Sequence, residues 1–420
     1  MAVSPEPVEP SNPAPVAVIG AGAAGLVAAI FAAREGAPTV LLEGSAKIGT
    51  KILISGGGRC NVLPGRYDEQ AFFTQGSRNV LRRLFRPWPH AEIRAWLEDE
   101  LGVALKLEAD SGKLFPVSDK ARTVRDALVS ASQQAGVEIR TGWRVGALDA
   151  PGEDGLWTLH RDGEDGETLR AKTVVMATGG QSVPKTGSDG QGYAMARALG
   201  HSALPVYPAL VPLRHAEEDL LELSGVALPI CWSAWKDGKC LERGERAALL
   251  THQGMSGPAI LDASHWVIRE GAELRIGWGG HDRDAWAALL KKSGARTLGS
   301  FLQEHLPKRL VATLLDRAQL SDLQNLAQLT REARERLLAV LGDFVLPVTG
   351  DRGFAVAEVT GGGIPLGEVQ PSTLESRQQE SLYLCGEILD CIGRIGGHNF
   401  LWAWVTGRLA GTQAAKKARA

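Results

Sequence analysis

The fold of this chain is decided by residues 16–43, VAVIGAGAAGLVAAIFAAREGAPTVLLE. The β-branched run Val16–Ile19 leads into the glycine pattern Gly20-x-Gly22-x-x-Gly25, and an alanine-rich segment with helical character continues to about Arg34. A second apolar run, residues 39–42, ends on Glu43, 18 residues after the last glycine. This pattern predicts a strand, a tight turn, a helix and a second strand, which is the start of a Rossmann-like α/β fold.

Each part of the pattern suits a dinucleotide. Gly20 permits the turn, Gly22 lets a diphosphate approach the backbone, and Gly25 lets the helix pack closely on the sheet. The first helical turn, which includes Ala23 and Ala24, presents free N–H groups at the positive end of the helix dipole. Glu43 is placed to accept hydrogen bonds from ribose hydroxyls and disfavours a 2′-phosphate, so we expect FAD or NAD rather than NADP. The alternative is a glycine-rich turn in another α/β protein.

Composition narrows the class of protein. The 420 residues carry 46 Lys and Arg against 48 Asp and Glu, a net charge of −2 that favours neither nucleic acid nor an anionic membrane as a partner. Residues 1–14 are proline-rich and acidic, which predicts a disordered tail rather than a signal peptide. The five cysteines form no zinc-spacing pattern, so we expect reduced thiols, a cytoplasmic protein and no metal site.

The glycine-rich loop at residues 44–61, GSAKIGTKILISGGGRCN, follows the predicted ribose acid. A loop of this composition can present several backbone N–H groups to a phosphate or a ribityl chain. We therefore expect cofactor contacts from Lys51, Ser55, Gly57, Gly58, Arg59, Cys60 and Asn61. Arg59 could instead pair with an anionic substrate, and Cys60 is not expected to be a nucleophile. The alternative is a plain flexible loop with solvated cations.

Three later segments add to the predicted site. A short strand near Val145 is placed to contact adenine through its backbone, and the apolar strand 173–176 leads into Ala177, Thr178 and Gly179 where the chain returns to the nucleotide. Near the C-terminus, strand 381–385 is followed by Gly386-Glu387, the loop GRIGGHN and a helix from about Phe400. We expect contacts from Gly386, Glu387, Gly397, His398, Asn399 and Phe400, with the last helix directed at the flavin. Two half-sites, one near each end of the chain, favour FAD over NAD.

The domain organisation follows from the same pattern. Residues 15–203 and 345–420 are expected to form the FAD-binding domain. Residues 204–282 contain short strand-like runs punctuated by proline, which predicts an inserted β-rich domain, and residues 283–344 are expected to form a helical subdomain.

The chain as a whole resembles a family of bacterial FAD-dependent flavoproteins, most of unassigned function. Described members are aminoacetone-oxidase-like or reduce unsaturated bile-acid ketones. The resemblance rests on seven segments: Gly20–Gly25, residues 51–61 (KILISGGGRCN), 177–180, 223–225, 254–258 (GMSGP), 386–390 (GEILD) and 396–400 (GGHNF). It implies a two-dinucleotide-binding-domain flavoprotein with an inserted β-barrel-like domain and a small helical domain. The chain departs from the family pattern at His398, where Tyr is usual, and at Leu401, where Gln is usual.

The resulting functional hypothesis is an FAD-dependent oxidoreductase that transfers a hydride between a small-molecule substrate and flavin N5. His398 is the candidate catalytic polar group, and a histidine satisfied by backbone at a helix start is the alternative. A second GxGxxG unit is missing, so either NAD(P)H docks transiently as reductant or oxygen reoxidises the flavin. Other hypotheses are an amine or aminoketone oxidase using O2, a non-catalytic flavin-binding protein acting through a partner, and an NAD-binding dehydrogenase without flavin.

Overall fold

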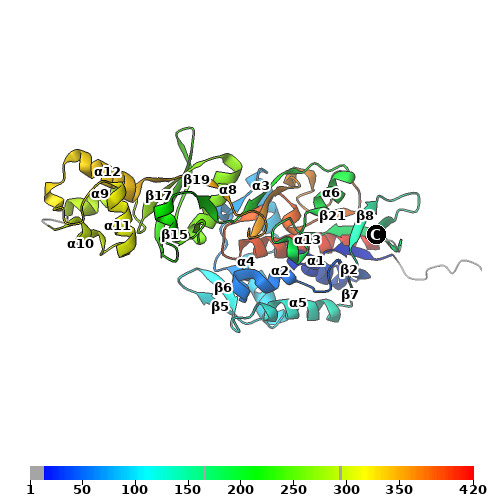
Figure 1. Cartoon of the computed structure of the whole chain (residues 1–420). Helices are drawn as coiled ribbons and strands as arrows, with labels where there is room; N and C mark the ends of the chain where they lie inside the picture. Colours follow the sequence, from blue (N-terminus) through cyan, green and yellow to red (C-terminus); the bar gives the residue numbers. More distant parts are fainter. Residues whose placement is uncertain (1–13, 164–165, 293–295) are drawn as a thin grey trace, which may run out of the picture. The chain divides into compact units, whose positions relative to one another are not determined.

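The computed structural model describes residues 14–163, 166–292 and 296–420, and these form two compact units (Figure 1). Unit 1 contains the chain up to Val206 together with Gly362–Ala420, and unit 2 is Tyr207–Gly361. The expected tail at residues 1–14 lies outside the described residues except for Ala14. The chain crosses between the units through β12 (Leu204–Ala209) and β20 (Val359–Gly363).

Unit 1 is built on a parallel sheet with the strand order β21-β11-β1-β2-β7. Its strands are β1 (Val16–Ile19), β2 (Thr39–Glu43), β7 (Glu138–Thr141), β11 (Thr173–Met176) and β21 (Leu382–Leu384). β1, β11 and β21 are buried throughout, as expected for a sheet covered on both faces. β1 lies between β2 and β11, with Val16 paired to both Thr39 and Thr173. The first strand of the sequence is therefore the centre of the sheet.

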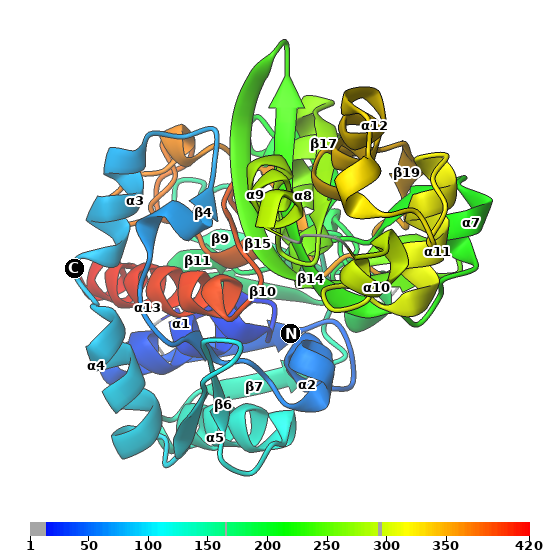
Figure 2. The same ribbon diagram turned by 90° about the vertical axis from the view of Figure 1, so that its left-hand side faces the viewer.

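Helices and small sheets surround this parallel sheet. The helices of unit 1 are α1 (Ala23–Arg34), α2 (Thr50–Ile54), α3 (Arg78–Phe85), α4 (His90–Ala95), α5 (Ala121–Gln134), α6 (Gln191–Ala198) and α13 (His398–Arg419). Figure 2 shows α1 and α13 side by side. The smaller sheets contain β3 (Leu63–Pro64), β4 (Phe72–Phe73), β5 (Leu105–Glu108), β6 (Lys113–Pro116), β8 (Val145–Asp149), β9 (Trp157–Arg161), β10 (Thr168–Ala171) and β22 (Ile392–Gly393).

Unit 2 combines a seven-stranded sheet with helices. The strand order is β18-β17-β14-β15-β16-β13-β19, and all of the described pairings are antiparallel. The strands are β13 (Leu213–His215), β14 (Ala227–Lys236), β15 (Lys239–Thr251), β16 (Gly254–Ser256), β17 (Glu273–Trp278), β18 (Phe344–Leu346) and β19 (Val348–Asp351). The helices are α7 (Glu218–Leu221), α8 (Pro258–Glu270), α9 (Arg283–Lys292), α10 (Leu298–Leu302), α11 (Lys308–Arg317) and α12 (Arg331–Gly342).

The observed units correct one expected boundary. Residues 345–361, assigned from the sequence to the FAD-binding domain, belong to unit 2 because β18 and β19 are the two edge strands of its sheet. The expected β-rich and helical segments also share one apolar core, which runs from Ile230 and Trp278 in the sheet to Leu314 and Leu337 in the helices. Within the described ranges, no helix combines the length and apolar character needed to cross a bilayer.

Candidate functional site

The first glycine loop joins β1 to α1, and its three glycines have different surroundings. A methyl group on Gly20 would lie 2.6 Å from the carbonyl oxygen of Ala177, and one on Gly25 would lie 1.8 Å from the carbonyl oxygen of Gly20. Both positions are therefore closed by the protein's own backbone. Gly22 differs, because a methyl group there would meet nothing within 4 Å and its φ of −79° suits any residue. Packing within the chain does not explain this glycine, whereas the approach of a ligand does.

The start of α1 is open for an anion. Gly22 is the N-cap, the helix has no side-chain cap, and its first turn, Ala23 to Gly25, contains no acidic residue. The N–H groups of that turn are thus left to a ligand at the positive end of the helix dipole. Glu43 lies beside this loop, since its carboxylate accepts hydrogen bonds from the backbone N–H groups of Ala21 and Ser45, both at 2.9 Å. These two bonds fix the carboxylate and leave lone pairs on both oxygens.

The segment Ala177–Gly179 returns to the same loop, as expected. The N–H of Ala177 donates to the carbonyl of Ile19 at 2.9 Å, which continues the pairing of β11 with β1. The side-chain oxygen of Thr178 is buried and has no hydrogen-bond partner among the described residues. A buried hydroxyl without a partner is costly, and a bound polar ligand would satisfy it. Gly179 has a φ of +73°, and a methyl group there would lie 2.7 Å from the hydroxyl oxygen of Ser188. The backbone conformation and the packing of the chain therefore explain why this position is glycine.

The C-terminal half-site meets the N-terminal one. Glu387 accepts a hydrogen bond from the ammonium of Lys51 at 2.7 Å, although 336 residues separate them. A methyl group on Gly386 would lie 2.8 Å from the β-carbon of Ala24 in α1. Ser182 completes the arrangement, because its hydroxyl donates to Glu387 at 2.9 Å and accepts from Lys51. Lys51 and Glu387 were predicted from the sequence; Ser182 was missed because it follows the ATGG segment without a motif of its own.

Close packing of α13 on α1 brings these segments together. Methyl groups on Gly407 and Gly411 would lie 2.4 and 2.1 Å from the carbonyl oxygens of Ala24 and Ala28. The two helices therefore touch through backbone, as small residues permit. Two half-sites that share one cofactor require the N-terminal and C-terminal segments to meet in space, and the structure packs α13 onto α1.

A second glycine loop precedes α13 and is packed against the chain itself. Gly397 is the N-cap, with a φ of +95°, and a methyl group there would lie 2.4 Å from the carbonyl carbon of Leu63. Asn399 closes the loop by accepting from the N–H of Gly393 at 2.8 Å and donating to its carbonyl at 2.9 Å. His398 is buried, and its ring meets Phe72 edge-on at 5.6 Å between centroids.

Phe400, the last residue of that predicted group, stacks on Trp404 with a centroid distance of 5.3 Å. Val145 opens β8, where it is buried and pairs with Arg161 in the small antiparallel sheet. Two residues before it, the N–H of Trp143 donates to the carbonyl of Glu43 at 2.9 Å. The structure therefore brings the Val145 segment to the predicted ribose acid.

The loop at residues 55–61 has the open backbone that its glycines predict. Gly56, Gly57 and Gly58 have φ values of +54°, +67° and +84°, and methyl groups on the last two would meet no atom closer than 3.9 Å. Ser55 turns back on its own helix, because its hydroxyl donates to the carbonyl of Ile52 at 2.7 Å. The side-chain oxygen of Asn61 lies 3.0 Å from a methyl group built on Gly56.

Arg59 and Cys60 are engaged within the protein. The guanidinium of Arg59 pairs with Glu108 at 3.0 Å and Asp119 at 2.9 Å and lies 4.0 Å from the ring centre of Phe115. The predicted contact of Arg59 with a phosphate or substrate thus stays a prediction. Cys60 is fully buried, and burial raises the pKa of its thiol to about 12. A protonated buried thiol is inert at neutral pH, as expected from the sequence.

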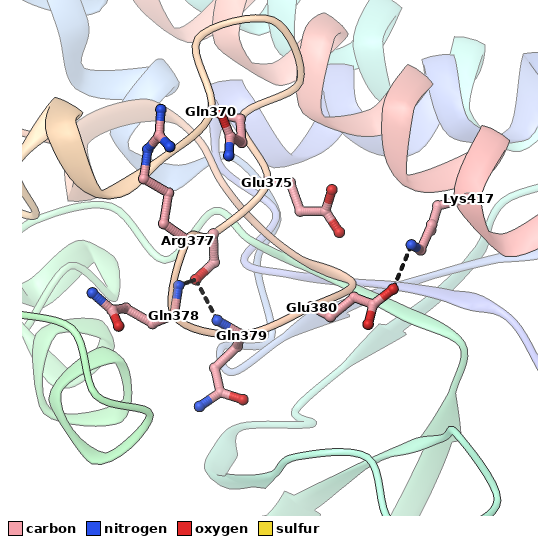
Figure 3. Close-up of a pocket in the computed structure, with 8 residues that line it drawn as sticks. Gln370, Glu375, Arg377, Gln378, Gln379, Glu380 and Lys417 are labelled. Atoms are coloured by element: carbon pink, nitrogen blue, oxygen red, sulfur yellow. Dashed lines mark hydrogen bonds and ion pairs between the residues drawn. The ribbon is translucent and has the colours of Figure 1, made fainter.

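A polar pocket of about 400 Å³ lies elsewhere in unit 1, against the loop at residues 370–380 and Lys417 (Figure 3). At its wall, the hydroxyl of Ser376 lies 2.8 Å from Nε2 of His201, and Nδ1 of His201 lies 2.7 Å from Glu368. This spacing resembles a hydrolase triad. The Ser376 oxygen, however, accepts hydrogen bonds from the N–H groups of Gln378 and Gln379 at 3.0 and 2.9 Å, which occupies both lone pairs. The arrangement therefore pins the loop and leaves no nucleophile.

Comparison with known proteins identifies the family. A family model described as the HI0933-like protein Rossmann domain matches residues 14–413. The chain belongs to this family of FAD-dependent oxidoreductases. This match confirms the family resemblance that the sequence motifs indicated and the Rossmann-like fold class.

Members of the family with assigned names are similar along nearly the whole chain. A 3-dehydro-bile acid delta(4,6)-reductase of Clostridium scindens is 33% identical, over 96% of this chain and 99% of the relative. A ribosomal RNA dihydrouridine synthase of Escherichia coli is 34% identical, over 92% and 94%. A solved flavocytochrome c3 fumarate reductase in an open conformation shares the fold, with a TM-score of 0.51, 18% identity and coverage of 97% of this chain and 79% of that one.

The residues present fit FAD. The open position at Gly22, the uncapped start of α1 and the buried hydroxyl of Thr178 each call for a polar ligand, and they lie in one loop cluster. Glu387 and Lys51 stand where the C-terminal segment joins that cluster. A mononucleotide would be too short to reach both the loop cluster at the start of α1 and the pair formed by Lys51 and Glu387.

Proposed function

We propose that this protein is a reductase of a carbon–carbon double bond conjugated to a carbonyl group. The observation that supports this substrate class is the chemistry shared by two near-full-length relatives with different substrates. A delta(4,6) double bond of a 3-oxo bile acid is conjugated to its ketone, and the uracil double bond that a dihydrouridine synthase reduces is conjugated to a ring carbonyl. In both substrates, conjugation with the carbonyl makes a double-bond carbon electrophilic, so that it can accept a hydride, and the resulting enolate is then protonated at carbon.

The proposed cofactor is FAD, which when bound would supply a hydride from its N5 atom. We assign its diphosphate to Gly22 and the start of α1, and its adenosine ribose to Glu43. Lys51 and Glu387 would hold the ribityl chain, since their ion pair joins the two half-sites. Thr178 would donate its buried hydroxyl to the same ligand.

The start of α13 is the proposed position of the flavin edge. The N-terminus of this 22-residue helix has no side-chain cap and no acidic residue in its first turn, so its dipole favours negative charge there. His398, the first residue of the helix, is held edge-on by Phe72 and is the candidate for orienting the substrate carbonyl. The electrons would come from a nicotinamide dinucleotide that docks transiently.

An anaerobic half-reaction tests this proposal. The purified protein, with its flavin reduced by light, is mixed with a 3-oxo-delta(4,6) steroid, with a uridine-containing RNA, or with oxygen-free buffer as control. We expect the yellow oxidised spectrum to return with a conjugated acceptor and the product to gain two hydrogen atoms by mass spectrometry. A flavin that stays reduced with every such acceptor, but is reduced by amines and reoxidised by O2, would contradict the proposal and favour an amine oxidase.

A further inference from the structure

One face of α3 carries a concentrated positive charge. Arg78, Arg82 and Arg86 follow one another at intervals of four residues, so they form a stripe along the helix and its C-cap, and Arg83 lies beside it. All four side chains are exposed. The opposite face, Leu81, Leu84 and Phe85, is buried in the core of unit 1.

The charge of this stripe is only partly neutralised within unit 1. Glu69 pairs with Arg82 at 2.8 Å, and its backbone carbonyl accepts from Arg78 at 2.9 Å. Among the residues that the structure describes, neither Arg83 nor Arg86 pairs with a carboxylate. Residues 66–86 contain five arginines, no lysine and two acidic residues, although the whole chain has a net charge of −2. The nearly balanced net charge, from which we expected no nucleic-acid partner, therefore hides a local excess of positive charge in residues 66–86.

An exposed aromatic residue stands next to the stripe. Tyr67 is 38% exposed, follows the exposed Arg66 and lies 5.1 Å from the ring of Phe85 in α3. It also contacts Phe72 at 6.4 Å, and Phe72 in turn contacts His398 at 5.6 Å. β4, which carries Phe72, pairs with β22 at the start of the second glycine loop. A chain of ring contacts thus runs from the charged surface to the proposed flavin edge.

We propose that this arginine face, formed by Arg66, Tyr67, Arg78, Arg82, Arg83 and Arg86, binds the phosphate backbone of RNA and delivers a uridine to the reduction site. The inference rests on the proposed function and names its substrate class. One guanidinium group can bind two oxygens of a phosphate at once, and an exposed tyrosine ring offers a stacking surface to an unpaired base.

The distribution of charge and apolar residues excludes other occupants. Charges spread over two turns of helix suit a polymer of phosphates better than a single small anion. A helix that lies in a membrane surface needs an apolar face turned outward, and the apolar face of α3 is turned into the core. Figure 2 shows α3 beside α13, the helix whose first residue is His398.

Binding of the FAD-loaded full chain to a short fluorescent uridine-containing RNA, measured against salt concentration, tests the inference. Arg83→Glu/Arg86→Glu is the informative variant, because these two side chains break no ion pair. We expect at least a tenfold loss of affinity at low salt, and a log–log salt slope shallower by about 1.4, since each lost phosphate contact removes roughly 0.7. Lys120→Glu/Arg122→Glu, which makes the same change of net charge at exposed positions of the same unit, is the matched control and should bind within about twofold of the unmodified protein. Unchanged melting temperature and flavin content in both variants exclude misfolding.

Equal RNA affinity in the two double variants would overturn the inference, as would binding of the unmodified protein to anionic vesicles but not to RNA. The proposed reaction is judged separately by the half-reaction of the unmodified protein with the conjugated steroid. Loss of RNA binding in Arg83→Glu/Arg86→Glu combined with no hydride transfer to any acceptor would support the RNA surface and contradict the reductase. Reduction of the steroid by the unmodified protein, combined with normal RNA binding by Arg83→Glu/Arg86→Glu, would support the reductase and contradict the RNA surface.

Discussion

The two glycine loops that begin α1 and α13 look alike in sequence and differ in what fills the space around them. In the first loop, Gly22 faces a region with no protein atom within 4 Å of an added methyl group. In the second, Gly397 is pressed onto the carbonyl carbon of Leu63, and Asn399 binds both backbone groups of Gly393. Packing within the chain therefore requires glycine in the second loop, whereas in the first loop it leaves Gly22 open for the ligand that we propose. The predictions below are designed to separate these two uses.

Gly397→Ala should have the largest effect, and it should be on stability. The residue has a φ of +95° and a methyl group would lie 2.4 Å from backbone that cannot move aside. Strain and clash together should lower the free energy of unfolding by about 3 kcal/mol or more. Chemical denaturation measures this, with Gly367→Ala as control, since Gly367 has no atom within 4 Å of an added methyl group and should change little. Equal stability of the two variants would show that the second loop is not closed as described.

Gly22→Val should act on the cofactor and spare the fold. The backbone at Gly22 suits any residue and the added side chain meets no protein atom near its first carbon, so the melting temperature of the flavin-free protein should be unchanged. The branched side chain would fill the space assigned to the diphosphate. We expect FAD affinity to fall on the order of 100-fold, or about 2.7 kcal/mol, by titration of flavin fluorescence. Gly152→Val, at an exposed and open position, is the control; unchanged affinity in Gly22→Val would place the diphosphate elsewhere.

Asn399→Ala should have the smallest effect of the three. It removes one hydrogen bond to the N–H of Gly393 and one to its carbonyl, at a cost of about 1–2 kcal/mol in stability. Asn399→Asp keeps an acceptor for the N–H and places a negative charge at a helix start, so it should lose less. The ranking by denaturant midpoint is the measurement. If both variants are as stable as the unmodified protein, the amide does not close the loop.

Much of unit 1 could be predicted because local chemistry and the global fold agree there. The strand Val16–Ile19 was predicted with its observed bounds, the helix was placed to Arg34 as observed, and the second strand differs only by including Glu43. The glycine spacing fixes the turn, and apolar runs of this length suit buried parallel strands. Lys51 and Glu387 were each expected near the cofactor, and the structure shows them paired although 336 residues separate them.

Other features depend on contacts that no local pattern encodes. Ser182 joins Lys51 and Glu387 only because three distant segments converge. In the sequence, Arg59 lies in a glycine loop without a nearby acidic residue, which suggests a cation that is free to bind a ligand. In the structure its charge is neutralised by Glu108 and Asp119, which come from a separate segment. The boundary at residue 345 was misplaced because β18 and β19 are short strands whose membership in a sheet is set by their partners. Net charge, being an average over the chain, concealed the stripe on α3.

The division of unit 1 into two stretches of sequence has a consequence for biosynthesis. Unit 2 is a single continuous run and is complete once Gly361 has been made, whereas the sheet of unit 1 lacks β21 and the surface of α1 lacks α13 until residues 382–419 have been made. During that interval the nascent chain exposes an unpaired strand edge at β11 and an alanine-rich helix surface, both of which invite aggregation. Nascent chains of this protein should therefore bind chaperones that act on the ribosome, and cofactor loading should follow the synthesis of α13.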